Sequence, residues 1–144
     1  MATYYMRVDG SAANKEAATS DAAAATSMDV AMFASESFAA DDVIIVSDAG
    51  GVYTGETLDL DGLSDLTLQA NSGGSPKFTG TSQIVSMELS YRITIDGIEF
   101  EKTSGYAYGL LRANSPGDDC VFKNCTVHGA DDGGLVLGDY TCLL

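Results

Sequence analysis

A repeat of about 27 residues constrains the fold of this 144-residue chain more than any other feature, because a regular period of about 20–50 residues is typical of repeat architectures. Three short segments begin alike and follow one another at this spacing: Leu66-Thr67-Leu68, Ile93-Thr94-Ile95 and Cys120-Val121-Phe122. A second apolar column recurs with a similar period: Leu58, Ile84-Val85, Leu110-Leu111 and Val136-Leu137. In such architectures each repeat packs on its neighbours, so the chain is expected to build a stack of similar units.

The content of each repeat predicts strands. The repeated pieces are short, alternate apolar with polar residues and favour β-branched side chains. Clusters of Gly, Asn, Ser and Asp separate them and leave no room for a long helix: 71–76, 114–119 and 131–134. The sequence therefore predicts an all-β parallel β-helix with coils of about 26–27 residues. Leu66, Ile93 and Cys120 would form one inward column, and Leu68, Ile95 and Phe122 another.

Residues 1–40 lack the repeat and predict a different local structure. Residues 3–8 read as a strand, and residues 11–26 as a loop with one helical turn. A short amphipathic helix is expected within residues 27–37, capped by Thr26 or Ser27 and lying across the open end of the coils. The predicted organisation is an N-terminal strand, loop and capping helix over residues 1–40, followed by β-helix coils over residues 41–144.

The C-terminal end predicts a continuation or a partner. A further coil would start near residue 147, but the sequence given stops at Leu144. An open apolar cross-section is unfavourable in water. We therefore expect the coils to continue beyond residue 144, or another copy or another protein of the same assembly to cover this edge.

Charge argues against two classes of partner. The chain has 21 acidic residues against 7 Lys and Arg, a net charge of −14. Nucleic acids and anionic membranes both attract basic surfaces, so neither is an expected partner. The sequence has no apolar run long enough for a membrane-spanning helix, and residues 1–7 do not resemble a secretion signal.

The three cysteines do not predict a zinc site, because the chain has no CxxC pair and a single His. Cys120 and Cys125 replace apolar residues of earlier repeats, so both are expected to be small buried side chains. With Cys142 the number is odd, and no disulfide is predicted.

The order of several segments resembles a known family. These segments are 3–5, 9–11, the expected helix, 41–46 and 51–56. Together they resemble the N-terminal portion of the right-handed, pectate-lyase-like parallel β-helix superfamily, and are most similar to phage or prophage β-helical structural and tailspike-like proteins. The resemblance implies a right-handed, single-stranded β-helix in a virion, outside the cell or at its surface. It implies little about activity, because the superfamily includes lyases, hydrolases, tailspikes and inert fibres.

The candidate catalytic residues form no recognisable family motif. Lyases and hydrolases of this superfamily use acidic residues on adjacent coils, or Ca²⁺ with a basic residue. The candidates of these types are Asp118, Asp119, His128, Asp131, Asp132 and Asp139, with Arg92, Arg112 and Lys123 as bases or substrate clamps. The structural interpretation of each is favoured: Asp119 lies one repeat after Arg92 and predicts a salt bridge, Asp131 and Asp132 sit in a Gly-rich turn, and His128 is expected in a turn. No catalytic, cofactor or metal ligand is therefore assigned, and Asp131 and Asp132 remain weak Ca²⁺ candidates.

Two tyrosines are candidates for glycan contact. Tyr106 and Tyr108 alternate along one segment, so their rings would face the same side, although tyrosine is also an ordinary strand residue. The favoured hypothesis is a non-catalytic structural component of a phage-type fibre, tailspike or other extracellular appendage, in contact with a surface polysaccharide. One alternative is the N-terminal part of a polysaccharide lyase or glycoside hydrolase, and another is a carbohydrate-binding module.

Overall fold

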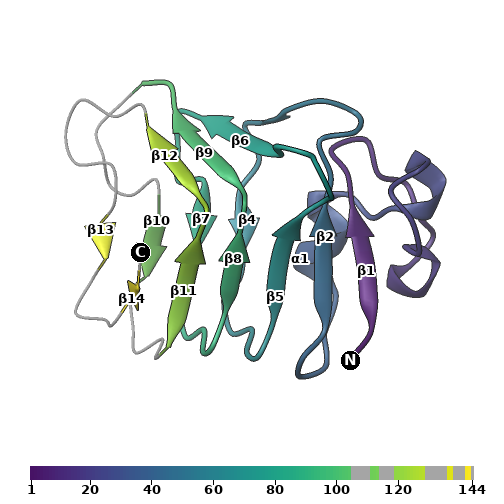
Figure 1. Cartoon of the computed structure of the whole chain (residues 1–144), viewed down its shortest axis with the longest axis horizontal. Coiled ribbons are helices and arrows are strands. Elements are labelled where there is room, and N and C mark those ends of the chain that lie inside the picture. The colour runs from purple at the N-terminus through teal and green to yellow at the C-terminus, as the bar shows by residue number, and fades with distance from the viewer. Residues whose placement is uncertain (105–110, 114–118, 129–135, 138–141, 144) are drawn as a thin grey trace.

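Three parallel sheets form most of the structure, which is a computed structural model (Figure 1). It describes residues 1–104, 111–113, 119–128, 136–137 and 142–143. Sheet 1 has the order β1 (Thr3–Met6), β2 (Val43–Val46), β5 (Thr67–Ala70), β8 (Thr94–Asp96), β11 (Cys120–Lys123) and β14 (Cys142–Leu143). Sheet 2 contains β4 (Leu58–Asp59), β7 (Val85–Ser86), β10 (Leu111–Ala113) and β13 (Val136–Leu137). Sheet 3 contains β3 (Tyr53–Thr54), β6 (Lys77–Gly80), β9 (Glu99–Lys102) and β12 (Thr126–His128).

The chain visits the three sheets in a fixed order. From β2 onward it passes from sheet 1 to sheet 3, then to sheet 2, and returns to sheet 1 beside the strand that it left. The strands of each sheet therefore follow one another from the N-terminal end to the C-terminal end of the molecule (Figure 1). In sheet 1, Leu68 pairs with Ile95, and Ile95 with Phe122. This register confirms the inward column predicted from the repeat.

The predicted fold class, an all-β parallel β-helix, is wrong. Beside the sheets lie the 3₁₀-helices η1 (Lys15–Ala17) and η2 (Ala24–Thr26) and the α-helix α1 (Val30–Ser35). Parallel sheets combined with short helices are closer to a mixed α/β fold than to an all-β one. The physical reason lies in the Ala-rich stretch before β2, where high helix propensity produces short helical turns instead of strand or loop.

The helix α1 contacts β4 and is drawn behind β2 in Figure 1. Its cap is Asp29 and not the predicted Thr26 or Ser27, since Asp29 Oδ1 accepts the backbone N–H of Met32 at 2.7 Å. The helix buries Val30 and Phe33 in the apolar core, which explains why so short a helix is stable.

The core lies between the sheets and consists of stacked side chains. Tyr53, Phe78 and Phe100 come from successive strands of sheet 3 and are almost completely buried. The rings of Tyr53 and Phe78 stack with centroids 4.3 Å apart, and Phe100 follows 5.9 Å from Phe78. Aromatic pairs at these distances add to the stabilisation that burial provides. Leu66, Ile93 and Cys120 are buried as predicted.

The second predicted column is only partly confirmed. Val85 pairs with Leu111 as expected, but Leu58 pairs with Val85 and not with Ile84. Val136 pairs with Arg112 and not with Leu110. The strands of sheet 2 are two or three residues long, and such strands contain too few positions for a periodic pattern to fix their register.

Candidate binding groove on the outer face of sheet 1

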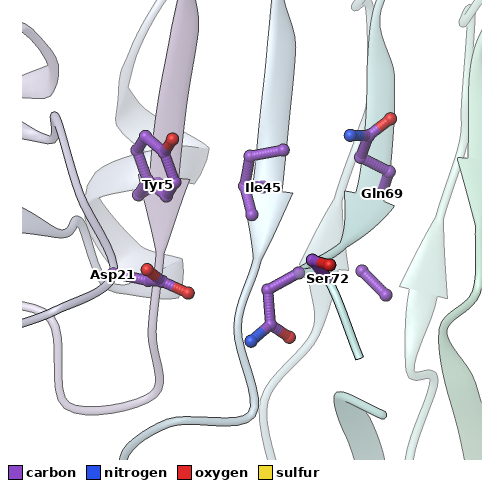
Figure 2. A pocket seen from close by; sticks show the side chains of 7 residues that line it. Tyr5, Asp21, Ile45, Gln69 and Ser72 are labelled. Carbon is purple, nitrogen blue, oxygen red and sulfur yellow. The ribbon is translucent and has the colours of Figure 1, made fainter. Parts of the chain in front are cut away.

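Three half-buried side chains form a row on the outer face of sheet 1. Tyr5 is the register partner of Ile45, and Ile45 is the partner of Gln69. Because side chains alternate along a strand, the neighbours of these residues point into the core while the row points outward. Figure 2 shows Tyr5, Ile45 and Gln69 side by side on neighbouring strands. Adjacent members of the row are therefore about one strand spacing, about 4.8 Å, apart.

A groove follows the row at the carboxyl ends of β1, β2 and β5. Its volume is about 410 Å³, within the range of about 300–1,000 Å³ typical of small-molecule sites. Its remaining lining residues are Asp21, Ala70, Asn71 and Ser72. Asp21 and Ser72 lie beside the carboxyl ends of the strands that carry the row (Figure 2). The groove therefore joins an apolar floor to several polar groups.

Arg7 fixes the loop that carries Asp21. Its Nη1 donates to the backbone oxygen of Asp21 at 2.8 Å. The same guanidinium binds Asp9 through two bonds of 2.8 and 3.0 Å, and this pairing raises the pKa of Arg7 and lowers the pKa of Asp9. Arg7 thus binds the carboxylate of Asp9 but the backbone oxygen of Asp21, and Asp21 lines the groove.

Asp48 fixes the turn on the other side of the groove. Its carboxylate accepts the backbone N–H of Ser75 at 3.1 Å and the side-chain amide of Asn71 at 3.3 Å. These bonds, the one from Ser75 first, hold the pKa of Asp48 below its ordinary value. The polar side of the groove is therefore held by protein contacts and does not depend on a ligand.

An ion pair continues the row beyond Gln69. Asp96 is the register partner of Gln69, and Lys123 is the partner of Asp96. Lys123 Nζ lies 2.9 Å from Asp96 Oδ2, and Asn124 donates to Asp96 Oδ1 at 2.7 Å. The bond from Asn124, followed by that from Lys123, lowers the pKa of Asp96. Along one line the sheet thus presents an aromatic ring, an aliphatic chain, an amide and a neutralised charge pair.

Most of the predicted site residues lie outside the described residues: Tyr106, Tyr108, Asp118, Asp131, Asp132 and Asp139. The backbone of Arg112 lies in β10. The prediction that Arg92 binds Asp119 is wrong. Arg92 instead binds Asp65, one repeat earlier, through two bonds of 2.5 and 2.7 Å. Asp65 is also the main cause of the raised pKa of Arg92, to which Asp119 contributes least. Asp119 is exposed in a left-handed backbone conformation with φ of 63°.

His128 and the cysteines differ in part from their predictions. His128 was expected in a turn but is the last residue of β12, where it pairs with Glu101. Cys120 is buried as predicted, and its backbone pairs with Cys142 of β14. Cys125 is only half-buried; its thiol contacts the backbone oxygens of Lys123 and Ile95, and burial raises its pKa.

The predicted Ca²⁺ ligands Asp131 and Asp132 lie outside the described part of the chain. Within that part, no group of three or more His, Cys, Asp or Glu side chains could hold a metal ion. The structure instead draws attention to Tyr5, Gln69 and Asp21, which the repeat did not reveal. They lie in segments that the period does not relate to one another: the register of β1, β2 and β5 aligns Tyr5 with Gln69, and the bond from Arg7 places the loop of Asp21.

Comparison with known proteins adds no relative: no family model, curated protein or solved structure matches the chain. Among the described residues, no helix is long and apolar enough to cross a membrane.

Proposed function

We propose that this chain is a non-catalytic structural segment of a phage-type fibre, tailspike or other extracellular appendage. The observation that carries the proposal is the locking of each repeat to the next by registered contacts on both faces of the sheets. Such contacts make a stiff, directional element, which is what a fibre or spike requires.

The inner contacts are the stacked columns. Tyr53, Phe78 and Phe100 form one column in sheet 3, and Leu68, Ile95 and Phe122 form another in sheet 1. A shift by one residue would move each of these side chains to the opposite face of its sheet, so burial of the columns fixes the register strongly.

The outer contacts are ion pairs between neighbouring strands or their turns. Lys77 of β6 binds Glu99 and Glu101 of β9 at 3.0 and 2.5 Å, and these contacts raise the pKa of Lys77. Arg92 reaches back one repeat to Asp65, and Lys123 reaches back to Asp96. Each pair is weak in water, but opposite charges at matched positions favour one register over others.

The test is to locate the polypeptide in its native source. Particles, filaments and culture supernatant are separated by density-gradient centrifugation, and peptides of residues 1–144 are quantified by mass spectrometry in each fraction. The proposal predicts co-sedimentation with particles or filaments at a fixed ratio to their other proteins. Recovery only in the soluble fraction would overturn it.

A further inference from the structure

The groove on sheet 1 joins a short apolar floor to a polar end that carries a negative charge. Tyr5 and Ile45 form the floor, and Asp21 lies beside the carboxyl end of β1 (Figure 2). We propose that the groove binds a lysine side chain of a partner protein, with its alkyl stem on the floor and its ammonium group at Asp21. The inference goes beyond the structural role and does not depend on it.

The carboxylate of Asp21 is available to a ligand. Arg7 binds the backbone oxygen of Asp21 and directs two other bonds to the carboxylate of Asp9. Among the described residues, no side chain forms a hydrogen bond or an ion pair with the Asp21 carboxylate. Asp21 is half-buried, so a cation bound to it would be screened less by salt than a cation on an open surface. A carboxylate in this position favours a ligand that brings its own positive charge.

The charge around the groove has the sign that attracts such a ligand. Arg7 and Asp9 form an ion pair, and Asp48 binds the lining residue Asn71. Two carboxylates, those of Asp21 and Asp48, therefore add negative charge to this side of the groove. The whole chain carries a net charge of −14, and a field of this sign raises the local concentration of cations. An anionic ligand would meet repulsion here instead.

The shape of the groove suits a lysine side chain. Lysine has a flexible four-carbon stem that packs on apolar surface and a compact ammonium group with three donors. Tyr5 and Ile45 are register partners, so the stem can lie across one continuous surface, and the ring of Tyr5 adds attraction for the cation. Gln69 follows at the other end of the floor, two strand spacings or about 10 Å from Tyr5. Its amide can both donate to and accept from the backbone of the partner.

The test is titration of the full chain with two blocked tripeptides that differ only in their central side chain. One carries lysine, and the other carries norleucine, which keeps the stem but lacks the ammonium group. Binding is followed by chemical-shift changes in ¹H–¹⁵N NMR spectra at an ionic strength of about 0.02 M. We expect the lysine peptide to give saturable shifts centred on Tyr5, Ile45 and Gln69, and the norleucine peptide to bind at least about tenfold more weakly, which is about 1.4 kcal/mol. Raising the ionic strength to about 0.15 M should weaken binding of the lysine peptide only.

Two matched variants separate the groove from the general negative field of the chain. Asp21→Asn removes the charge in the groove, and Asp41→Asn removes one charge at an exposed position that does not line it. Asp21→Asn should weaken binding of the lysine peptide by at least about tenfold, whereas Asp41→Asn should bind as the wild type does. Tyr5→Ala should weaken binding of the lysine peptide, and Tyr5→Phe should retain most of it, because the ring remains. Urea unfolding of every variant shows whether it is folded.

Several outcomes would overturn the proposal. They are the absence of saturable shifts with the lysine peptide, equal binding of the two peptides, and equal loss of binding in folded Asp21→Asn and Asp41→Asn proteins. n-Butylammonium tests the source of the ammonium group: binding as tight as that of the lysine peptide would assign the groove to a small amine and not to a partner protein. These results leave the particle-association test untouched, so the two proposals fail separately.

Discussion

The hydroxyl group of Tyr53 in β3 contacts the last residue of β1 and the residue that follows β2. The side chain is fully buried, and its hydroxyl lies 3.0 Å from the backbone oxygen of Met6 and 2.9 Å from that of Ser47. Tyr53→Phe keeps the stacked ring but leaves both carbonyl oxygens without this donor. We expect the free energy of unfolding to fall by about 1–3 kcal/mol. Urea denaturation measures the change, and Tyr91→Phe, at a half-buried position outside the core, serves as the control.

The same residue predicts a pH dependence. Burial is the main cause that raises the pKa of Tyr53. Folded protein therefore keeps a proton that unfolded chains lose above about pH 10, and stability falls as pH rises beyond that value. Tyr53→Phe lacks this contribution, so the stability difference between wild type and variant should narrow between about pH 9 and pH 11.5. A constant difference across this window would show that Tyr53 ionises alike in both states.

Leu89 carries a conformational cost that glycine would remove. Its φ is 57° and its side chain is 56% exposed, while Gly62 has a φ of 71° one repeat earlier. Left-handed backbone costs an L-residue about 1–2 kcal/mol, and glycine loses about 0.5–1 kcal/mol in chain entropy. Leu89→Gly should therefore raise the free energy of unfolding by about 0.5–1 kcal/mol. Val52 serves as the control, because it is 46% exposed and has no positive φ. Val52→Gly should lower the free energy of unfolding.

At the scale of single residues, the sequence spacing predicted Asp119 as the partner of Arg92, although a second aspartate lies at the same spacing on its other side. Arg92 has an aspartate one repeat before it, Asp65, and another one repeat after it, Asp119. The repeat makes the two equivalent, and the structure selects Asp65. The choice depends on side-chain direction and backbone conformation, which a period does not encode.

At the scale of elements, α1 depends on its cap. A six-residue helix is too short to be stable alone, and Asp29 satisfies one of its otherwise unpaired N–H groups. Asp29→Ala should lower the free energy of unfolding by about 1 kcal/mol, whereas Asp29→Asn should keep most of the stability. Urea denaturation of the two variants side by side separates loss of the cap from loss of charge. Equal destabilisation by both would assign the effect to charge.

Elements with strong patterns were predicted better than short ones. The four β-branched residues of β2 indicated a buried strand, and the structure has a strand at Val43–Val46. The Ala-rich stretch was expected to be a loop with a single helical turn, but it contains η1 and η2. Their three-residue length leaves no periodic signal, and their position depends on backbone bonds to β1, such as that from Tyr5 N–H to the oxygen of Ala18 at 3.0 Å.

At the scale of the whole molecule, the repeat predicted parallel pairing but not the fold class. The period correctly predicted which residues pair in sheet 1, because each of its longer strands contains two or more residues that recur at the repeat spacing. The groove was not predicted, since the spacings that separate Tyr5, Ile45 and Gln69 in the sequence do not match the period. The first spacing includes the helical segment between β1 and β2, and the second belongs to a coil that is shorter than the next one, since β2 and β5 pair at an offset of 24 residues and β5 and β8 at 27.

Net charge predicts how the whole molecule responds to salt. With 21 acidic and 7 basic residues, the carboxylates outnumber the Lys and Arg side chains by 14, and the mutual repulsion of this excess opposes the folded state. Raising ionic strength from about 0.01 M to about 0.15 M shortens the screening length from about 30 Å to about 8 Å. It weakens the outer ion pairs as well, but each contributes little. We therefore expect Tm at pH 7 to rise over this range, measured by circular dichroism.

Lower pH changes both the repulsion between carboxylates and the contribution of the ion pairs to stability. Protonation removes the repulsion first, so the salt effect on Tm should shrink as pH falls toward about 4. The pKa values of Asp48, Asp65 and Asp96 are lowered by their partners, so their contribution to stability is complete above about pH 4 and is lost as pH falls through their folded values. These contributions should therefore lower Tm as pH falls below about 4, at either salt concentration. A Tm that falls with added salt at pH 7 would mean that the ion pairs between repeats outweigh the repulsion of the excess carboxylates. As a control, choline chloride replaces NaCl: an equal rise in Tm with both salts indicates screening, and a larger rise with NaCl indicates binding of sodium.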